Sequence, residues 1–451
     1  MASTEIDPKW AWAPFEPSSE IPWNLSAVAH LFRRAGFGAT WEQLQAALQS
    51  SPGDTVQQMI SEHEPAEFAD GMQRLASAAV ATGNVRQLSA WWAYRMLSTP
   101  AQVLEKTTLF WHGHFATSAE KVNDGQLMLT QNELLRRFAL NDFGALVQEI
   151  SRDPAMLLWL DSATNRKQHP NENYAREVME LFCLGEGNYT EHDIRELARC
   201  FTGWEVRREQ FRINRYQHDT GSKTILGQSG EFDGEDGVRI VLSQSATAEF
   251  IVRKLIRFFV SDTLPLTAEL IAPLAKLMRE SDLRIAPVLS AILRSQLFFS
   301  PYAFAAKIRS PAELAIGFLR CLDGTANTFE LSTAMDAVGQ GLFFPPNVKG
   351  WDGGRTWINS STLLGRSNLI RRMLESEQTR FGRQSLREYL VDQQIARPDE
   401  ICNRLESLLL AVPLPPVARE RLTTMLKADS SPHGLIEAVH LFCSLPEFQL
   451  C

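Results

Sequence analysis

Residues 171–203 read NENYAREVMELFCLGEGNYTEHDIRELARCFTG, and this stretch decides the fold class. Asn171 is a good N-cap for a first helix, and Thr190 with Asp193 resembles a capping box that would start a second helix. Apolar residues follow each start at helical spacing: Tyr174, Val178, Leu181 and Phe182, then Ile194, Leu197, Ala198 and Phe201. The stretch therefore predicts two consecutive amphipathic helices, each closed by a glycine.

The same spacing recurs on both sides of this stretch. It predicts further helices near residues 24–35, 40–49, 54–62, 67–82, 85–98, 100–112, 123–140, 142–151, 246–261, 266–280, 284–297 and 310–322. Residues 211–240 alternate in polarity and then become rich in glycine, which predicts a small β-hairpin or irregular flap. Residues 343–358 contain two adjacent prolines and several glycines, so a long irregular loop is expected there. We expect a mainly α fold, a multi-helix globular bundle with these two irregular features.

The chain length predicts more than one packed region. At 451 residues the chain exceeds the size at which a single hydrophobic core stops growing. Residues 1–23 carry four prolines and are expected to form an extended N-terminal arm that packs its tryptophans on the body. Residues 24–375 are expected to form a helical core domain that includes the flap, and residues 376–451 a C-terminal helical region packed on that core.

Composition and charge exclude some classes of function. The net charge of −8 gives no electrostatic attraction to nucleic acid or anionic lipid. No apolar run reaches the roughly 18 residues of a membrane span. The six cysteines form no C-x-x-C pair, and no signal peptide is visible at the first residues. We expect a cytoplasmic protein by default, or an exported one if a leader has been removed.

The predicted helix 100–112 carries the first candidate site. Glu105 and His112 share one face of this helix, and Gly113 could end it and bring His114 back beside His112. Two imidazoles with a carboxylate from Glu177 or Glu180 would suit zinc, iron or manganese better than calcium or magnesium. Our candidate metal ligands are His112, His114 and Glu180. The structural alternative is that both histidines form hydrogen bonds to backbone at a buried helix end.

The second candidate site is the polar stripe of the helix after Asn171. Arg176, Glu177 and Glu180 lie on one face of this helix, and a dense run of polar residues precedes them. We expect Arg176 and Glu177 to be catalytic, and the preceding polar residues to bind substrate: Asn171, Glu172 and Asn173. The alternative is a salt-bridged face or a polar network that holds the loop against the helix.

Two further segments outside these helices carry candidate residues. The adjacent His218 and Asp219 in the flap could act as a catalytic base and the carboxylate that orients it, although an exposed turn is the commoner explanation. Long irregular loops in helical domains are often functional. From the loop near 343–358 we expect Lys349, Trp351 and Asp352 to bind substrate.

Several of these strings resemble one bacterial family, catalogued as domain of unknown function 1800. They are LFRRAGFG (31–38), EKTTLFWHGHFATS (105–118), PNENYAREVMELF (170–182), YTEHD (189–193), FTGW (201–204), His218-Asp219 and PPNVKGWDGG (345–354). The resemblance runs from about residue 25 to 370 and implies no assigned activity. It singles out the candidate residues above and also His30, but not His169, where relatives commonly differ. Many relatives look exported and have sulfatase-like companions encoded nearby, so the resemblance implies that such a companion protein could be a partner.

The motif residues are polar, far apart in sequence and concentrated at helix ends and loops. A packing scaffold would instead be recognised by apolar periodicity. We therefore expect an enzyme with a polar site in a helical cleft, metal-assisted or not, that acts on a polar small molecule or polymer. The alternative is a non-catalytic binding or assembly protein that works with a partner protein.

Overall fold

Local capping chemistry starts many of the helices. In the computed structural model, which describes residues 6–451, Thr190 and Asp193 form the capping box expected from the sequence and start α13 (Glu191–Cys200). Ser310 and Glu313 do the same for α18 (Pro311–Cys321). Each capping side chain accepts from a backbone N–H that has no partner inside its helix, which fixes where the helix begins.

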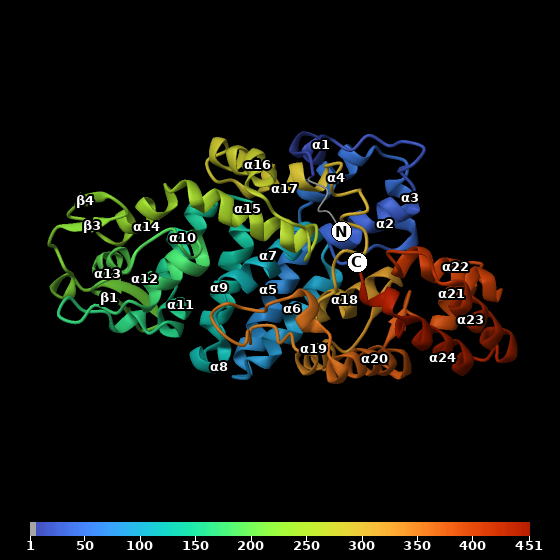
Figure 1. Cartoon of the computed structure of the whole chain (residues 1–451). Coiled ribbons are helices and arrows are strands. Elements are labelled where there is room, and N and C mark those ends of the chain that lie inside the picture. Colours follow the sequence, from blue (N-terminus) through green and yellow to red (C-terminus); the bar gives the residue numbers. More distant parts are fainter. Residues whose placement is uncertain (1–5) are drawn as a thin grey trace.

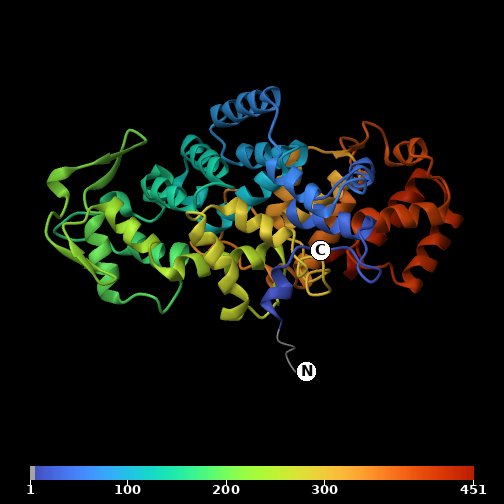
Figure 2. The same ribbon diagram turned by 90° about the horizontal axis from the view of Figure 1, so that it is seen from above.

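The helices form three groups along the long axis of the molecule (Figure 1). One end holds α10 (Phe143–Arg152), α11 (Pro154–Trp159), α12 (Asn173–Glu177), α13 and α14 (Gly234–Leu242). The middle holds α1 (Pro8–Trp12), α4 (Pro52–Ser61), α5 (Ala66–Ala81), α6 (Arg86–Ser98), α7 (Gln102–His114), α8 (Ala119–Val122), α9 (Gly125–Phe138), α15 (Ser245–Phe259), α16 (Ala268–Glu280), α17 (Ile285–Leu293), α18 and α19 (Thr328–Ala337). Toward the other end lie α2 (Leu25–Ala35), α3 (Trp41–Ala47), α20 (Ser360–Glu375), α21 (Leu386–Asp392), α22 (Pro398–Leu409), α23 (Pro416–Ala428) and α24 (Pro432–Cys443). Figure 2 shows the same order from above, with the middle of the sequence (green) at one end and the C-terminal helices (red) at the other.

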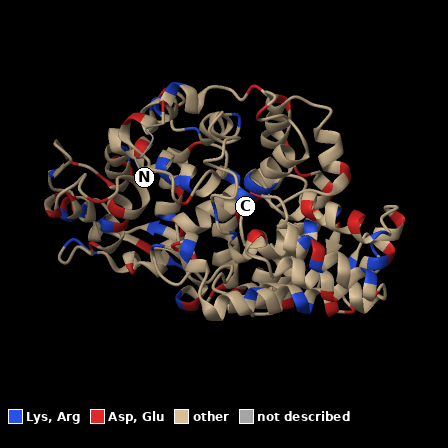
Figure 3. Ribbon diagram, turned by 45° about the vertical axis from the view of Figure 1, so that its right-hand side comes forward, with Lys and Arg blue, Asp and Glu red and all other residues tan. Residues whose placement is uncertain are grey.

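The expected mainly α fold is confirmed. Over residues 6–451 there are twenty-four α-helices, and the strands form only two-stranded antiparallel ribbons. These ribbons pair β1 (Trp204–Arg207) with β2 (Gln210–Ile213), β3 (Lys223–Ile225) with β4 (Gln228–Gly230), and β5 (Gly324–Thr325) with β6 (Arg380–Phe381). No helix in this part of the chain is long and apolar enough to cross a membrane. Acidic and basic residues are interspersed over the view in Figure 3.

The boundaries of the flap differ from the prediction of 211–240. Its first hairpin already begins at Trp204, because Trp204 and Val206 pair with the apolar residues of β2 and cover one face of the ribbon. Its last residues are helical, because Asp233 accepts from two backbone N–H groups and starts α14 at Gly234. The flap is therefore confined to 204–230.

The arm also contains regular structure. Within the expected extended segment 1–23, residues Pro8–Trp12 form the short helix α1, and residues 1–5 lie outside the described part. The Trp12 indole donates a hydrogen bond to the Leu270 carbonyl at 2.7 Å, and Phe15 stacks on Phe299. These contacts attach the arm to the helical body.

The buried apolar residues form two clusters that meet at α7. Val103 and Trp111 of α7 belong to the cluster that includes α10 to α17, whereas Leu109 belongs to the cluster that includes α18 to α24. Helix α7 is therefore enclosed on both sides, and its C-terminal end lies deep in the molecule. The polar residues at that end must find partners there, because an unpaired buried polar group is costly.

Candidate functional site

A π-helical segment lies in the centre of the candidate site. Helix α12 does not continue as an α-helix but widens into a π-helix over Val178–Cys183. Such π-turns are rare and occur frequently at functional sites, because the extra residue changes the direction of the side chains. Here the change follows Glu177 directly and includes Glu180.

Two side chains from other helices bind the carbonyls of this π-helical segment. The His114 Nε2 atom lies 3.0 Å from the Phe182 carbonyl oxygen, and Lys254 Nζ of α15 lies 3.0 Å from the Leu181 carbonyl oxygen. Lys254 also donates to His114 Nδ1 at 3.0 Å, so the proton on this imidazole sits on Nε2. Both ring nitrogens of His114 are therefore engaged, and none remains for a metal ion.

Burial alters the protonation of this pair. Burial, followed by the neighbouring Lys254 charge, holds the pKa of His114 well below 6.5, so the imidazole is neutral. Burial also lowers the pKa of Lys254 to about 8, and its ammonium lies 4.8 Å from the centre of the Phe250 ring. Lys254 is not among the residues predicted from the sequence; the signal for it is a lysine inside the apolar pattern of its helix.

His112 and His114 point in different directions, contrary to the sequence prediction. Helix α7 does not end at Gly113 but continues to His114, and two residues along an α-helix turn the side chain by about 200°. His112 accepts a hydrogen bond through Nε2 from the Phe343 backbone N–H at 3.1 Å. Burial lowers the pKa of His112 to about 3, which keeps it neutral and able to accept.

The bond to His112 holds a strained residue. Phe343 is fully buried and has a φ of 67°, a backbone conformation that is costly for a bulky side chain. Its N–H donates to His112, and its carbonyl accepts from the Ala119 N–H at 2.8 Å. Both backbone polar groups of Phe343 are thus fixed where the irregular loop begins.

The loop 345–354 then crosses the end of α7. Gly350 has a φ of 77° and packs so closely that a Cβ atom there would lie 2.1 Å from the Gly113 carbonyl oxygen. The Trp351 ring lies 5.5 Å from the His112 ring, measured between ring centres. With the loop held in this way, the side chains of Lys349 and Asp352 are exposed to solvent and Trp351 is half-buried.

Half-buried and exposed side chains of this loop and of the segment around the π-helix form what we call the polar face: Glu177, Glu180, Tyr189, Lys349, Trp351 and Asp352. Tyr189 donates to Glu180 Oε2 at 3.1 Å. Burial and then the neighbouring Glu180 charge raise the pKa of Glu177, while Arg176 and Lys349 act in the opposite direction. Because Lys349 influences Glu177 in this way, the loop and the α12 region share one electrostatic environment.

The other residues predicted on this stripe connect structural elements. Arg176 forms two 2.8 Å hydrogen bonds to Glu191 at the start of α13, and it lies 3.4 Å from Glu172. Asn171 accepts from the Asn173 backbone N–H at 2.9 Å and donates to the Asp161 carbonyl at 3.2 Å. These side chains hold the preceding loop and α13 against α12.

His218 and Asp219 are not part of the polar face. Asp219 accepts from Arg199 Nε at 2.7 Å, and this bond holds the pKa of Asp219 below its usual range. His218 Nδ1 lies 2.9 Å from the Thr202 carbonyl oxygen. Both contacts are at the C-terminal end of α13, roughly 13 Å along the helix from Thr190, which directly follows Tyr189 of the polar face. The pair fastens the flap to that end of α13.

The predicted metal ligands are not assembled. Within residues 6–451 no three His, Cys, Asp or Glu side chains are grouped closely enough to hold a metal ion. The structure does not bring His112, His114 and Glu180 together: the two imidazoles diverge, and both nitrogens of His114 form hydrogen bonds within the protein. Glu105 is not available either, because it receives two hydrogen bonds from Arg136 at 2.9 and 2.7 Å.

A family model described as Protein of unknown function (DUF1800) matches residues 30–450 of the chain. No curated protein and no solved structure matches the chain. The matched range includes α7, the π-helical segment and the loop 345–354, so the polar face and its buried supports both lie within it.

Proposed function

The chain belongs to the DUF1800 family of proteins of unknown function, and we propose that it is an enzyme that exchanges protons with a polar substrate at the polar face. One observation carries the proposal. Glu177 and Glu180 lie three residues apart where the α-helix becomes a π-helix, and the half-buried Glu177 has a raised pKa beside a second carboxylate and a lysine.

In this proposal the two carboxyl groups have different roles. A raised pKa keeps Glu177 protonated to a higher pH, which suits a general acid that later acts as a base. Glu180 supplies the second carboxylate and accepts from Tyr189. Lys349 and Asp352 would hold polar groups of the substrate, and the Trp351 ring would pack on its apolar surface. The substrate class is a polar small molecule or polymer, and no step passes through a metal ion.

A panel of chromogenic esters, glycosides and amides tests the proposal. With the best substrate found, Glu177→Gln is expected to lower kcat by about a hundredfold or more, because general acid–base catalysis contributes that much. Glu149→Gln, a similar change on the exposed side of α10, serves as the control and should keep full activity. Full activity of Glu177→Gln would refute the role given to Glu177.

A second function is favoured by a different observation. Arg176, His112, His114, His218 and Asp219 all bind backbone or neighbouring side chains, which suits a protein whose motifs hold loops in place for a partner. In that case the companion protein would dock on the polar face. Capture of one defined partner by the wild type, its loss in Lys349→Glu, and no activity on any substrate of the panel would favour this alternative over the enzyme.

A further inference from the structure

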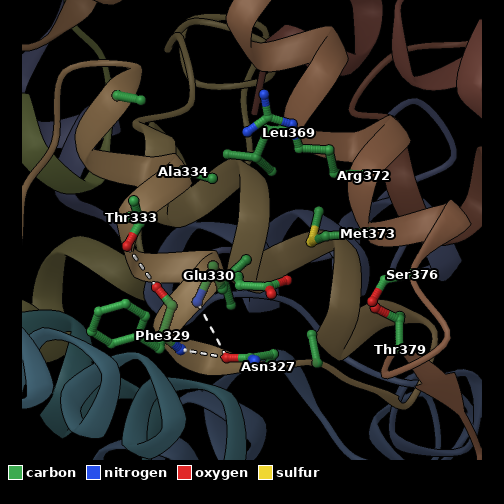
Figure 4. Close-up of a pocket in the computed structure, with 13 residues that line it drawn as sticks. Asn327, Phe329, Glu330, Thr333, Ala334, Leu369, Arg372, Met373, Ser376 and Thr379 are labelled. Carbon is green, nitrogen blue, oxygen red and sulfur yellow. Dashed lines mark hydrogen bonds between the residues drawn. The ribbon is translucent and has the colours of Figure 1, made fainter.

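A separate pocket of about 380 Å³ lies between α19 and α20. Its volume falls within the roughly 300–1,000 Å³ of typical small-molecule sites. Its walls are mainly apolar and include Phe329, Ala334, Leu369 and Met373 (Figure 4). None of the residues of the polar face lines this pocket, so an inference from it is independent of the proposed function.

Two polar residues of the pocket wall, Asn327 and Thr333, form hydrogen bonds within the protein. Asn327 accepts from the backbone N–H groups of Phe329 and Glu330 at 3.0 and 3.2 Å and thereby caps α19. Its amide also donates to Gln378 Oε1 at 2.9 Å, which joins the start of α19 to the segment after α20. Thr333 donates to the Phe329 carbonyl at 2.8 Å. Because these polar groups already form hydrogen bonds within the protein, they are not available to bind a ligand.

Two oppositely charged, solvent-exposed side chains border the pocket, and within residues 6–451 neither has a charged partner. Glu330 comes from α19 and Arg372 from α20, on the two sides of the pocket in Figure 4. Among the described residues, neither side chain takes part in an ion pair. The adjacent Arg371 differs, since it contacts Glu375 at 2.8 Å and Glu437 at 2.5 Å on the other side of α20.

We propose that the α19–α20 pocket binds an apolar zwitterion, meaning an apolar amino acid or a short apolar peptide. The carboxylate of the ligand pairs with Arg372, whose planar guanidinium suits two parallel hydrogen bonds to a carboxylate. The ammonium group pairs with Glu330, and the apolar side chain is buried against Phe329, Leu369 and Met373. A ligand with a single charge satisfies only one of the two groups, so the pocket selects for a zwitterion.

Isothermal titration calorimetry of the full chain tests this selection. Leucine, dileucine and trileucine are titrated, with 3-methylbutylamine and 4-methylpentanoate as singly charged comparators. We expect at least one zwitterion to bind at least about tenfold more tightly than either comparator, because hydrogen bonds between charged groups are worth that much. The best length within the leucine series distinguishes an amino acid from a peptide as the ligand.

Matched variants locate the binding. Arg372→Gln and Glu330→Gln should each weaken the best zwitterion at least about tenfold, whereas the neighbouring controls Arg371→Gln and Glu375→Gln should leave Kd unchanged. Ala334→Phe should abolish binding by filling the pocket, and thermal unfolding checks that each variant is folded. Equal affinity for zwitterions and comparators, equal losses in the controls, or no binding of any ligand at millimolar concentration would each overturn the proposal.

Discussion

The polar residues of α7 and those of the polar face are close neighbours, but they differ in their access to water. Glu105, His112 and His114 are 0, 1 and 5% exposed, whereas Glu177 and Lys349 reach solvent. The buried groups are held by hydrogen bonds to helices and to the irregular loop, because an unpaired polar group would be costly there. The groups of the polar face remain accessible to solvent. The polar motif residues are therefore of two kinds, buried and solvent-accessible. Variants of the buried residues should lose stability, whereas variants of the polar face should keep it.

The largest effect is expected at Glu105. Burial would raise the pKa of its carboxyl, but Arg136 holds that pKa below the usual value through its charge and hydrogen bonds. Glu105→Ala would leave the buried Arg136 without its main partner, so we expect a loss of about 3–5 kcal/mol in the free energy of unfolding. Urea unfolding measures the loss, and Glu149→Ala on the surface should change stability by no more than about 0.5 kcal/mol. A small loss for Glu105→Ala would contradict the structural role.

The next effect concerns the two histidines. The double variant His112→Ala with His114→Ala leaves the Phe343 N–H and the Phe182 carbonyl unpaired, at a cost of about 1–3 kcal/mol for each group. Thermal unfolding measures this loss, and elemental analysis of both proteins provides the contrasting readout. If the histidines instead bind a metal ion, the wild type will carry that metal and the double variant will lose it while its fold remains stable.

The same burial predicts how stability depends on pH. His112 and His114 have pKa values below 6.5 in the folded protein, and the pKa of His112 is about 3. Below pH 6.5 the unfolded chain takes up protons that the folded chain does not, so stability falls as the pH falls, and for His112 this continues to about pH 3. Each histidine contributes up to about 1.4 kcal/mol per pH unit.

His112→Gln tests this dependence, because glutamine keeps an acceptor for Phe343 but does not titrate. Unfolding free energies are measured between pH 7 and 5 for this variant and the wild type. We expect a shallower slope for the variant by up to one histidine's contribution. An unchanged slope would show that His112 is not held neutral in the folded protein.

These contrasts also explain what the sequence could and could not predict. Both helices before and after Gly185 are predictable from apolar spacing, and α13 begins where Thr190 and Asp193 indicate. The predicted N-cap Asn171 is wrong, because Glu172 holds the N-cap position of α12 without a side-chain cap bond. The irregular loop is predictable as well, because adjacent prolines exclude regular helix. Fold class therefore follows from short-range patterns.

The partners of buried groups could not be predicted in this way. Helix α7 continues past Gly113, whose carbonyl packs closely against Gly350 far along the chain. Lys254 appears in the sequence only as one lysine within an apolar pattern, and its lowered pKa arises from contacts with α7 and the π-helical segment. The sequence thus identified the polar motif residues but not which of them would be buried.

The smallest effect is expected on the polar face, where a charge can be removed with little change in stability. Burial, followed by the neighbouring Glu180 charge, raises the pKa of Glu177, because a second negative charge nearby disfavours the ionised form. Glu180→Gln should lower the pKa of Glu177 and change the free energy of unfolding by less than about 0.5 kcal/mol. Lys349→Gln should have the opposite effect and raise this pKa, because it removes a nearby positive charge.

Carbon-13 NMR of the Glu177 carboxyl follows both shifts, and Glu172→Gln is the control because Glu172 pairs with Arg176. If the pKa of Glu177 is the same in the wild type, Glu180→Gln and Lys349→Gln, then neither Glu180 nor Lys349 influences Glu177 electrostatically. That result would remove the basis for a shared acid–base site.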